Sequence, residues 1–235
     1  MKADEVMKEL QRKGNAQTRK TWIRHGCPEP LFGVKVADMK VLMKKTGTDT
    51  ALAKELFRTG NGDAMYFAGL IADSRELSQE DLDEWARTAS WSMISEYSVA
   101  WNAAENPAGW ELALRWIDSS EDKISAAGWA TLGGIMAHRE DKDLDLKALE
   151  RLLDRVVKTI GKAPNRTRYA MNGFVIGAGG SVKALTKKAL EAAAKIGEVE
   201  VEMGGTSCKV PTATEYIKKI IAAGRHGKKR KMMKC

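Results

Sequence analysis

The chain has 235 residues, 43% of them hydrophobic and 30% charged, which suits one large soluble domain or two small ones. No apolar run approaches the roughly 18 residues that a membrane span needs, and the N-terminus does not resemble a signal peptide, so we expect a cytoplasmic protein without membrane contact. The formal net charge is +8, of which residues 225–235 supply six basic residues and no acid, leaving +2 for residues 1–224.

Helical patterns follow one another along almost the whole chain, with glycine, proline, asparagine and serine at the breaks. The predicted helices are residues 3–13, 16–24, 35–45, 50–58, 63–72, 78–88, a tryptophan-rich pair ending near 118, 121–138, 144–160, one that opens at Pro164 and closes at 177–180, 181–196 and 212–223. Residues 199–202 alternate apolar and polar side chains, which predicts a lone short strand or an extended linker. Residues 25–30 and 204–211 are predicted loops.

About twelve short helices joined by short turns, with no series of strands, indicate an all-α protein. Helix pairs that recur every 30 to 45 residues are typical of an α-solenoid of the HEAT or armadillo kind, built from antiparallel helix pairs with a concave groove; a globular helical bundle is the alternative. We expect one repeat domain over residues 1–224 and a basic, disordered tail over residues 225–235. Such a tail attracts nucleic acid or any other polyanion without selecting among them.

The cysteines give no sign of a metal site. Cys27, Cys208 and Cys235 are odd in number and lack metal-ligand spacing, so we expect free thiols, no disulfide framework and no metal. His25 lies close to Cys27, but nothing in the sequence supplies a third group to orient a nucleophile and its base.

Six of the seven tryptophans fall between Trp85 and Trp129, and Glu96 lies among them without a basic neighbour within a helical turn or two. Tryptophans at this density mark either a crowded helix-packing centre or an aromatic-walled pocket. If the segment is buried, Glu96 is a carboxylate in apolar surroundings, which shifts its pKa and often marks a site. The alternative is an exposed glutamate on an amphipathic helix.

Three segments carry a resemblance to a known family. Thr88-Ala-Ser-Trp91-Ser-Met-Ile-Ser-Glu96 resembles the segment in which AlkD-type DNA alkylation-repair glycosylases carry tryptophans and, four or five places on, an acidic residue. Trp116-Ile-Asp-Ser-Ser120 is similar to the end of the family's next helix pair, and Tyr169-Ala-Met-Asn-Gly-Phe174 matches more loosely a segment with another pocket aromatic. The resemblance covers most of the chain as a pattern of helices.

The resemblance implies a HEAT-like protein whose positively charged groove holds double-stranded DNA and which removes cationic N3- or N7-alkylpurines by hydrolysis, without a cofactor. A carboxylate there stabilises the sugar cation and positions a water, while aromatic faces attract the cationic base. Residue by residue, Glu96 takes the place of the carboxylate, Trp91 of one wall and Phe174 of the far wall.

The sequence departs from the family pattern at three places. The acid is glutamate where the glycosylases mostly show aspartate, which moves the charge by about 1 Å. Ser92 stands where a second adjacent tryptophan is expected, and residues 121–132 contain no arginine, although Arg115 and Arg139 flank them. The alternative to a glycosylase is therefore a noncatalytic module that binds duplex or branched DNA, or a protein partner.

Three clusters are candidate DNA contacts. The first surrounds the N-terminus of the helix at Pro164, where backbone N–H groups and the helix dipole favour phosphate, although a solvated face is the alternative. The second sets two hydroxyls and a lysine on the 204–211 loop, and the third is the basic tail. The candidates are Lys162, Arg166 and Arg168; Thr206, Ser207 and Lys209; and Lys228, Lys229, Arg230 and Lys231.

Overall fold

The computed structural model describes residues 1–234, and within them the regular structure is helical. The α-helices are α1 (Ala3–Lys13), α2 (Ala16–Arg24), α3 (Val36–Thr46), α4 (Thr50–Arg58), α5 (Gly62–Ile71), α6 (Gln79–Thr88), α7 (Ala100–Glu105), α8 (Gly109–Trp116), α9 (Asp122–His138), α10 (Leu146–Thr159), α11 (Asn165–Ser181), α12 (Thr186–Ile196) and α13 (Ala213–Ala222). A π-helix, Ile94–Val99, leads directly into α7. No helix of the described part is long and apolar enough to cross a bilayer.

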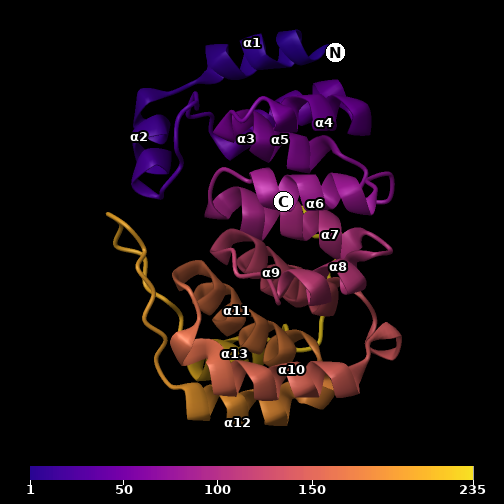
Figure 1. The fold of residues 1–235 in the computed structure, drawn as a ribbon, viewed down its shortest axis with the longest axis vertical. Helices are drawn as coiled ribbons and strands as arrows, with labels where there is room; N and C mark the ends of the chain where they lie inside the picture. The colour runs from indigo at the N-terminus through magenta and orange to yellow at the C-terminus, as the bar shows by residue number, and fades with distance from the viewer. Residues whose placement is uncertain (235) are drawn as a thin grey trace.

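The helices stack in chain order along the long axis of the molecule, with α1 at one end and α10 and α12 at the other (Figure 1). Helices at the surface bury one face: α10 buries Leu149, Leu152, Leu153 and Val156, which recur at helical spacing. Helix α5, inside the stack, is buried along its whole length. This arrangement confirms the predicted all-α solenoid.

Two apolar cores meet at α8 and α9. The first draws on the elements up to α9 and the second on those from α8 to α13. Close approach at the junction requires glycine, because a Cβ on Gly128 of α9 would lie 2.8 Å from the backbone nitrogen of Ile117, which follows α8. The long helices α9 and α11 pack on each other and position the residues described below.

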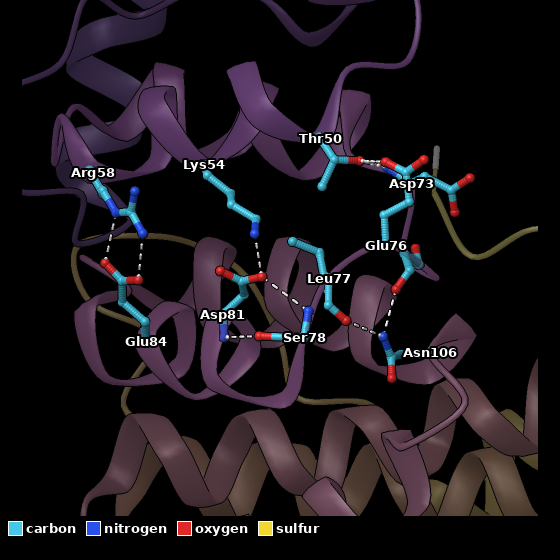
Figure 2. A network of polar contacts seen from close by, with 11 residues as sticks. Thr50, Lys54, Arg58, Asp73, Glu76, Leu77, Ser78, Asp81, Glu84 and Asn106 are labelled. Atoms are coloured by element: carbon cyan, nitrogen blue, oxygen red, sulfur yellow. Dashed lines mark hydrogen bonds and ion pairs between the residues drawn. The ribbon is translucent and has the colours of Figure 1, made fainter.

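Polar contacts also join successive layers. Figure 2 shows α4 facing α6, with Arg58 donating two 3.1 Å hydrogen bonds to Glu84 and Lys54 paired with Asp81. In the same view, the side-chain amide of Asn106, which follows α7, donates to the carbonyl of Leu77 at 2.9 Å. The exposed pair of Arg58 and Glu84 contributes about 0 to 1 kcal/mol, so burial in the two cores carries most of the stability.

The last residues fold back over the stack instead of leaving it. Residues 225–234, here called the C-terminal strap, run from α13 back along the stack to the end of α5, where Lys234 donates to the carbonyl of Ala72 (Figure 1). Lys229 donates hydrogen bonds to the carbonyls of Met136 (2.7 Å) and Ser181 (2.9 Å) and pairs with Asp141 at 2.7 Å. Met233 is buried in the first core. The sequence predicted a disordered tail here from its run of basic residues. That run does not show that carbonyls of other helices accept hydrogen bonds from the tail and hold it in place.

Candidate nucleic-acid interface

The π-helix Ile94–Val99 sends two adjacent side chains in different directions. Glu96 is 7% exposed, whereas its neighbour Tyr97 is 38% exposed, and the residues on either side of the two are buried. A π-helix inserts one extra residue into a helical turn and is found frequently at functional sites. Here it lets the segment bury a carboxylate and present an aromatic ring side by side.

Glu96 is paired with Arg166 from the first turn of α11. The guanidinium Nε and Nη2 each donate a 2.7 Å hydrogen bond, one to each carboxylate oxygen, and the same guanidinium carbon lies 4.4 Å from the ring centre of Tyr169. Burial raises the pKa of the Glu96 carboxyl, and the hydrogen bonds from Arg166 oppose that rise. Burial would lower the pKa of Arg166, but the carboxylate outweighs it and the pKa is raised.

The two interpretations of Glu96 from sequence placed it either in apolar surroundings or on an exposed face. The structure buries the carboxylate and supplies from α11 the basic partner that its sequence neighbours lack. A fork of two parallel N–H···O bonds is the strongest arrangement available to an arginine and a carboxylate.

The N-terminus of α11, predicted to bind phosphate, already holds a carboxylate. Asp122 of α9 accepts hydrogen bonds from the backbone nitrogens of Arg166 (3.0 Å) and Thr167 (2.7 Å) and from the Thr167 hydroxyl (2.8 Å). Arg168 donates to the carbonyls of Glu200 and Ala163, both at 3.0 Å. The expected phosphate site is therefore occupied by the protein's own groups, and only Lys162 of that cluster is exposed.

Residues 197–212 form the extended connection between α12 and α13 (Figure 1). Two side chains of α11 anchor this connection. The side chain of Asn165 makes two hydrogen bonds to the backbone of Glu202 (2.9 and 2.7 Å), and the amide of Asn172 donates to the carbonyl of Pro211 at 2.8 Å. Its tip reaches the end of α2, since a Cβ on Gly204 would lie 3.0 Å from the carbonyl oxygen of Arg24. Of the two alternatives for residues 199–202, the extended linker is the one observed.

Between α2, the π-helix, α11 and this extended connection lies a cavity of about 720 Å³, here called the aromatic cavity. Four rings line it: those of Trp22, Trp91, Tyr97 and Tyr169. Its border also carries three basic side chains, the imidazole of His25 and one carboxylate, that of Glu202; the basic side chains are those of Arg24, Arg166 and Lys209. An aromatic floor with cations around it suits nucleotides, whose bases stack on rings and whose phosphates pair with cations.

The predicted site residues divide between this cavity and other places. Glu96 lies beneath the cavity, and Trp91 and Lys209 line it. Thr206 and Ser207 do not line it. The hydroxyl of Thr206 donates to the Met203 carbonyl at 2.9 Å and closes the turn, and Ser207 is exposed beside it. Phe174, predicted as the far wall, is 1% exposed and packs against Trp129 in the second core. Tyr169, five residues earlier on α11, takes that place.

The basic residues of the strap lie elsewhere. The backbone nitrogen of Arg230 donates to the carbonyl of Ala137 at 2.8 Å, at the end of α9 opposite to Asp122. Fifteen residues of helix separate those ends, which is about 22 Å at 1.5 Å per residue. Lys228, Arg230 and Lys231 are exposed there, and Lys229 is held by protein carbonyls. The strap therefore adds no cation to the aromatic cavity.

Sequence reasoning missed Tyr97, Tyr169 and Arg24, which line the cavity, and the capping role of Asp122. Tyr97 carried a signal in its position next to Glu96, and Tyr169 stood in the segment that matched one with a pocket aromatic, although Phe174 was the residue chosen there. The groups that could bind a metal are scattered: no cluster of three or more His, Cys, Asp or Glu side chains within residues 1–234 has the geometry to hold an ion.

Comparisons with known proteins agree with the helical fold. Residues 6–217 match the model of a protein family described as DNA alkylation repair enzyme. Uncharacterized proteins from Listeria innocua and Listeria monocytogenes are 34% and 33% identical over 222 residues, covering 92% of this chain and 96% of each relative.

A solved structure matches over 100% of both chains with a TM-score of 0.93 and 37% identity. It is described as representing a new family of proteins related to the HEAT-like repeat DNA glycosylases, with affinity for branched DNA structures. The likeness confirms the HEAT-like character of the predicted solenoid.

Proposed function

This chain belongs to the DNA alkylation repair enzyme family, and we propose that within it the protein is a DNA-binding module that recognises branched DNA and does not excise bases. DNA lies across the aromatic cavity, with its phosphates on the surrounding cations. The relative of known structure, 37% identical over the whole chain, has affinity for branched DNA, and this supports the same preference here.

The single observation that carries the proposal is that Glu96 is buried and paired with Arg166. Excision of a cationic purine needs a carboxylate whose negative charge faces the developing sugar cation and whose oxygen can hold a water. Both oxygens of Glu96 are occupied by Arg166 at 2.7 Å, and the side chain is almost fully buried. The pair is neutral as a unit, so it offers the sugar little charge.

Charge distribution supports a polyanionic partner. Residues 183–235 contain thirteen Lys and Arg against five Asp and Glu, whereas residues 1–182 contain twenty-six of each. The net charge of +8 therefore lies in the last quarter of the chain, which includes Lys209 and the strap. Positive charge concentrated in this part of the sequence steers the protein toward nucleic acid and makes the affinity depend on salt.

The proposal is tested by measuring the affinity of the whole protein for a three-way junction and for a linear duplex of the same total length, at one salt concentration. We expect the junction to bind at least tenfold more tightly, and Arg24→Ala and Lys209→Ala to weaken its binding. Equal affinities for the two DNAs would overturn the preference for branches. No measurable binding to either would overturn the DNA-binding proposal and leave a protein partner as the alternative.

A further inference from the structure

We infer that the aromatic cavity receives the base of a single unpaired nucleotide at the branch point. This inference rests on the proposed function, because only DNA bound across the cavity can deliver a nucleotide into it. It adds the identity of the feature that is recognised: an unstacked base, and not only the angle between duplex arms.

The size and the walls of the cavity favour a flat aromatic ligand. Its volume of about 720 Å³ falls within the roughly 300 to 1,000 Å³ typical of small-molecule sites and is far too small for duplex DNA. Beside the four rings, Met93 and Met203 contribute sulfur-containing side chains that adapt to the shape of a ligand. Every base has an aromatic face, so such walls bind bases with little regard to sequence.

Tyr97 is the ring best placed to stack on an incoming base. Among the aromatic residues of the cavity, Trp22 and Trp91 are 8% and 7% exposed, whereas Tyr97 is 38% exposed on the π-helix. Its ring lies edge-on to Trp101, with centroids 5.5 Å apart, and this contact fixes its orientation. A held but accessible ring loses little conformational entropy when a base stacks on it.

Arg166 supplies a polar partner for the edge of the base. Its Nε and Nη2 are used by Glu96, and its Nη1 is directed toward the sulfur of Met203 at 3.7 Å. A thioether sulfur is a weak acceptor. A carbonyl oxygen or ring nitrogen of a base would therefore accept a stronger hydrogen bond from Nη1 than the sulfur does. Glu96 therefore acts as a positioning residue that aims the guanidinium, which stays cationic.

An unpaired base is the one that reaches this cavity at low cost. A base must leave the helical stack to enter, which costs a few kcal/mol for a paired base and least for one that is already unpaired. Arg24 and Lys209, which border the cavity from α2 and from the extended connection, are placed to hold the phosphates on either side of the extruded nucleotide.

The inference is tested with two three-way junctions that are alike except for one unpaired 2-aminopurine nucleotide at the branch point. We expect the wild type to bind the junction with the unpaired nucleotide about tenfold to a hundredfold more tightly than the fully paired one, the range for stacking one base. The fluorescence of 2-aminopurine should fall on binding, because stacking on an aromatic ring quenches it.

Tyr97→Ala should lose both this gain and the quenching, so that it binds the two junctions with about the same affinity. Tyr97→Phe keeps the ring and should retain both. Tyr216→Ala, which removes a 44% exposed tyrosine from α13, is the matched control and should behave as wild type.

Equal loss of affinity for both junctions in Tyr97→Ala would overturn the inference, and so would a wild type that binds both junctions equally. In either case the proposed function would still hold if the wild type binds three-way junctions more tightly than linear duplex. If that preference is itself absent, the proposed function fails.

Discussion

Arg166 donates a hydrogen bond of 2.7 Å to each carboxylate oxygen of Glu96, joining the start of α11 to a π-helix seventy residues earlier in the chain. The contact fixes the guanidinium over Tyr169 and neutralises the charge of the buried Glu96 carboxylate.

Breaking this pair from one side should be costly. Arg166→Ala leaves the Glu96 carboxylate buried without a partner, so we expect a loss of about 3 to 5 kcal/mol in the free energy of unfolding at pH 7. Burial already raises the pKa of Glu96, and loss of the cation raises it further. A group with a raised folded-state pKa favours folding at low pH, so part of the loss should be recovered as the pH falls toward 5.

Urea unfolding of Arg166→Ala, Glu96→Gln and the double variant measures the coupling. Glu96→Gln alone should cost about 1 to 3 kcal/mol, because the amide can accept from Arg166 but no longer matches its fork. The double variant should be less destabilised than the sum of the two. Additive losses would mean that the two side chains do not depend on each other.

The C-terminal strap should stabilise the fold rather than hang free. Lys229→Ala removes a donor from the carbonyls of Met136 and Ser181 and should cost about 1 to 3 kcal/mol, with a lower Tm. Lys228→Ala, an exposed neighbour, is the control and should stay within about 0.5 kcal/mol of wild type. Equal Tm values for the two variants would contradict the contacts of Lys229.

Lys209 should contribute one phosphate contact. It is exposed on the extended connection at the border of the aromatic cavity, so Lys209→Ala should weaken binding to all DNA sequences alike and reduce the slope of log K against log salt by about 1. Lys40→Ala, on α3, is the exposed control. An unchanged slope in Lys209→Ala, or an equal change in Lys40→Ala, would remove Lys209 from the interface.

The cysteines report on the same surface. Burial raises the pKa of the Cys27 thiol to about 12, so it stays protonated and unreactive at pH 8, whereas Cys208 is exposed at the cavity. In a Cys235→Ser background, iodoacetamide at pH 8 should label Cys208 only, and bound DNA should slow the reaction. Mass spectrometry gives the labelled residue. Labelling that DNA does not slow would place the DNA elsewhere.

The helices could be predicted because their signals are local. The apolar period of α10, the capping serine of α6 and the glycines at the turns all act within one or two helical turns. The sequence also pointed to Glu96 and Trp91. What it could not supply were contacts across repeats: Arg166 and Asp122 each meet a partner more than forty residues away.

Charge patterns misled for a related reason. Arg166, Arg168 and Lys229 looked like free cations, but each donates to a carboxylate or carbonyl that another helix or loop brings close. Phe174 was predicted to face the cavity, yet α11 presents Tyr169 there and turns Phe174 into the core. Which face of a helix meets which neighbour depends on packing of the whole stack, and the local sequence does not specify it.

A protein that binds DNA without excising bases should leave methylated duplex DNA intact, and base release from such DNA is the measurement that decides between the two functions. The wild type should bind DNA containing N3-methyladenine or N7-methylguanine and release neither base faster than it is lost without protein. Glu96→Gln should give the same result. Release by the wild type that Glu96→Gln abolishes would contradict a binding role without excision and make Glu96 the catalytic carboxylate.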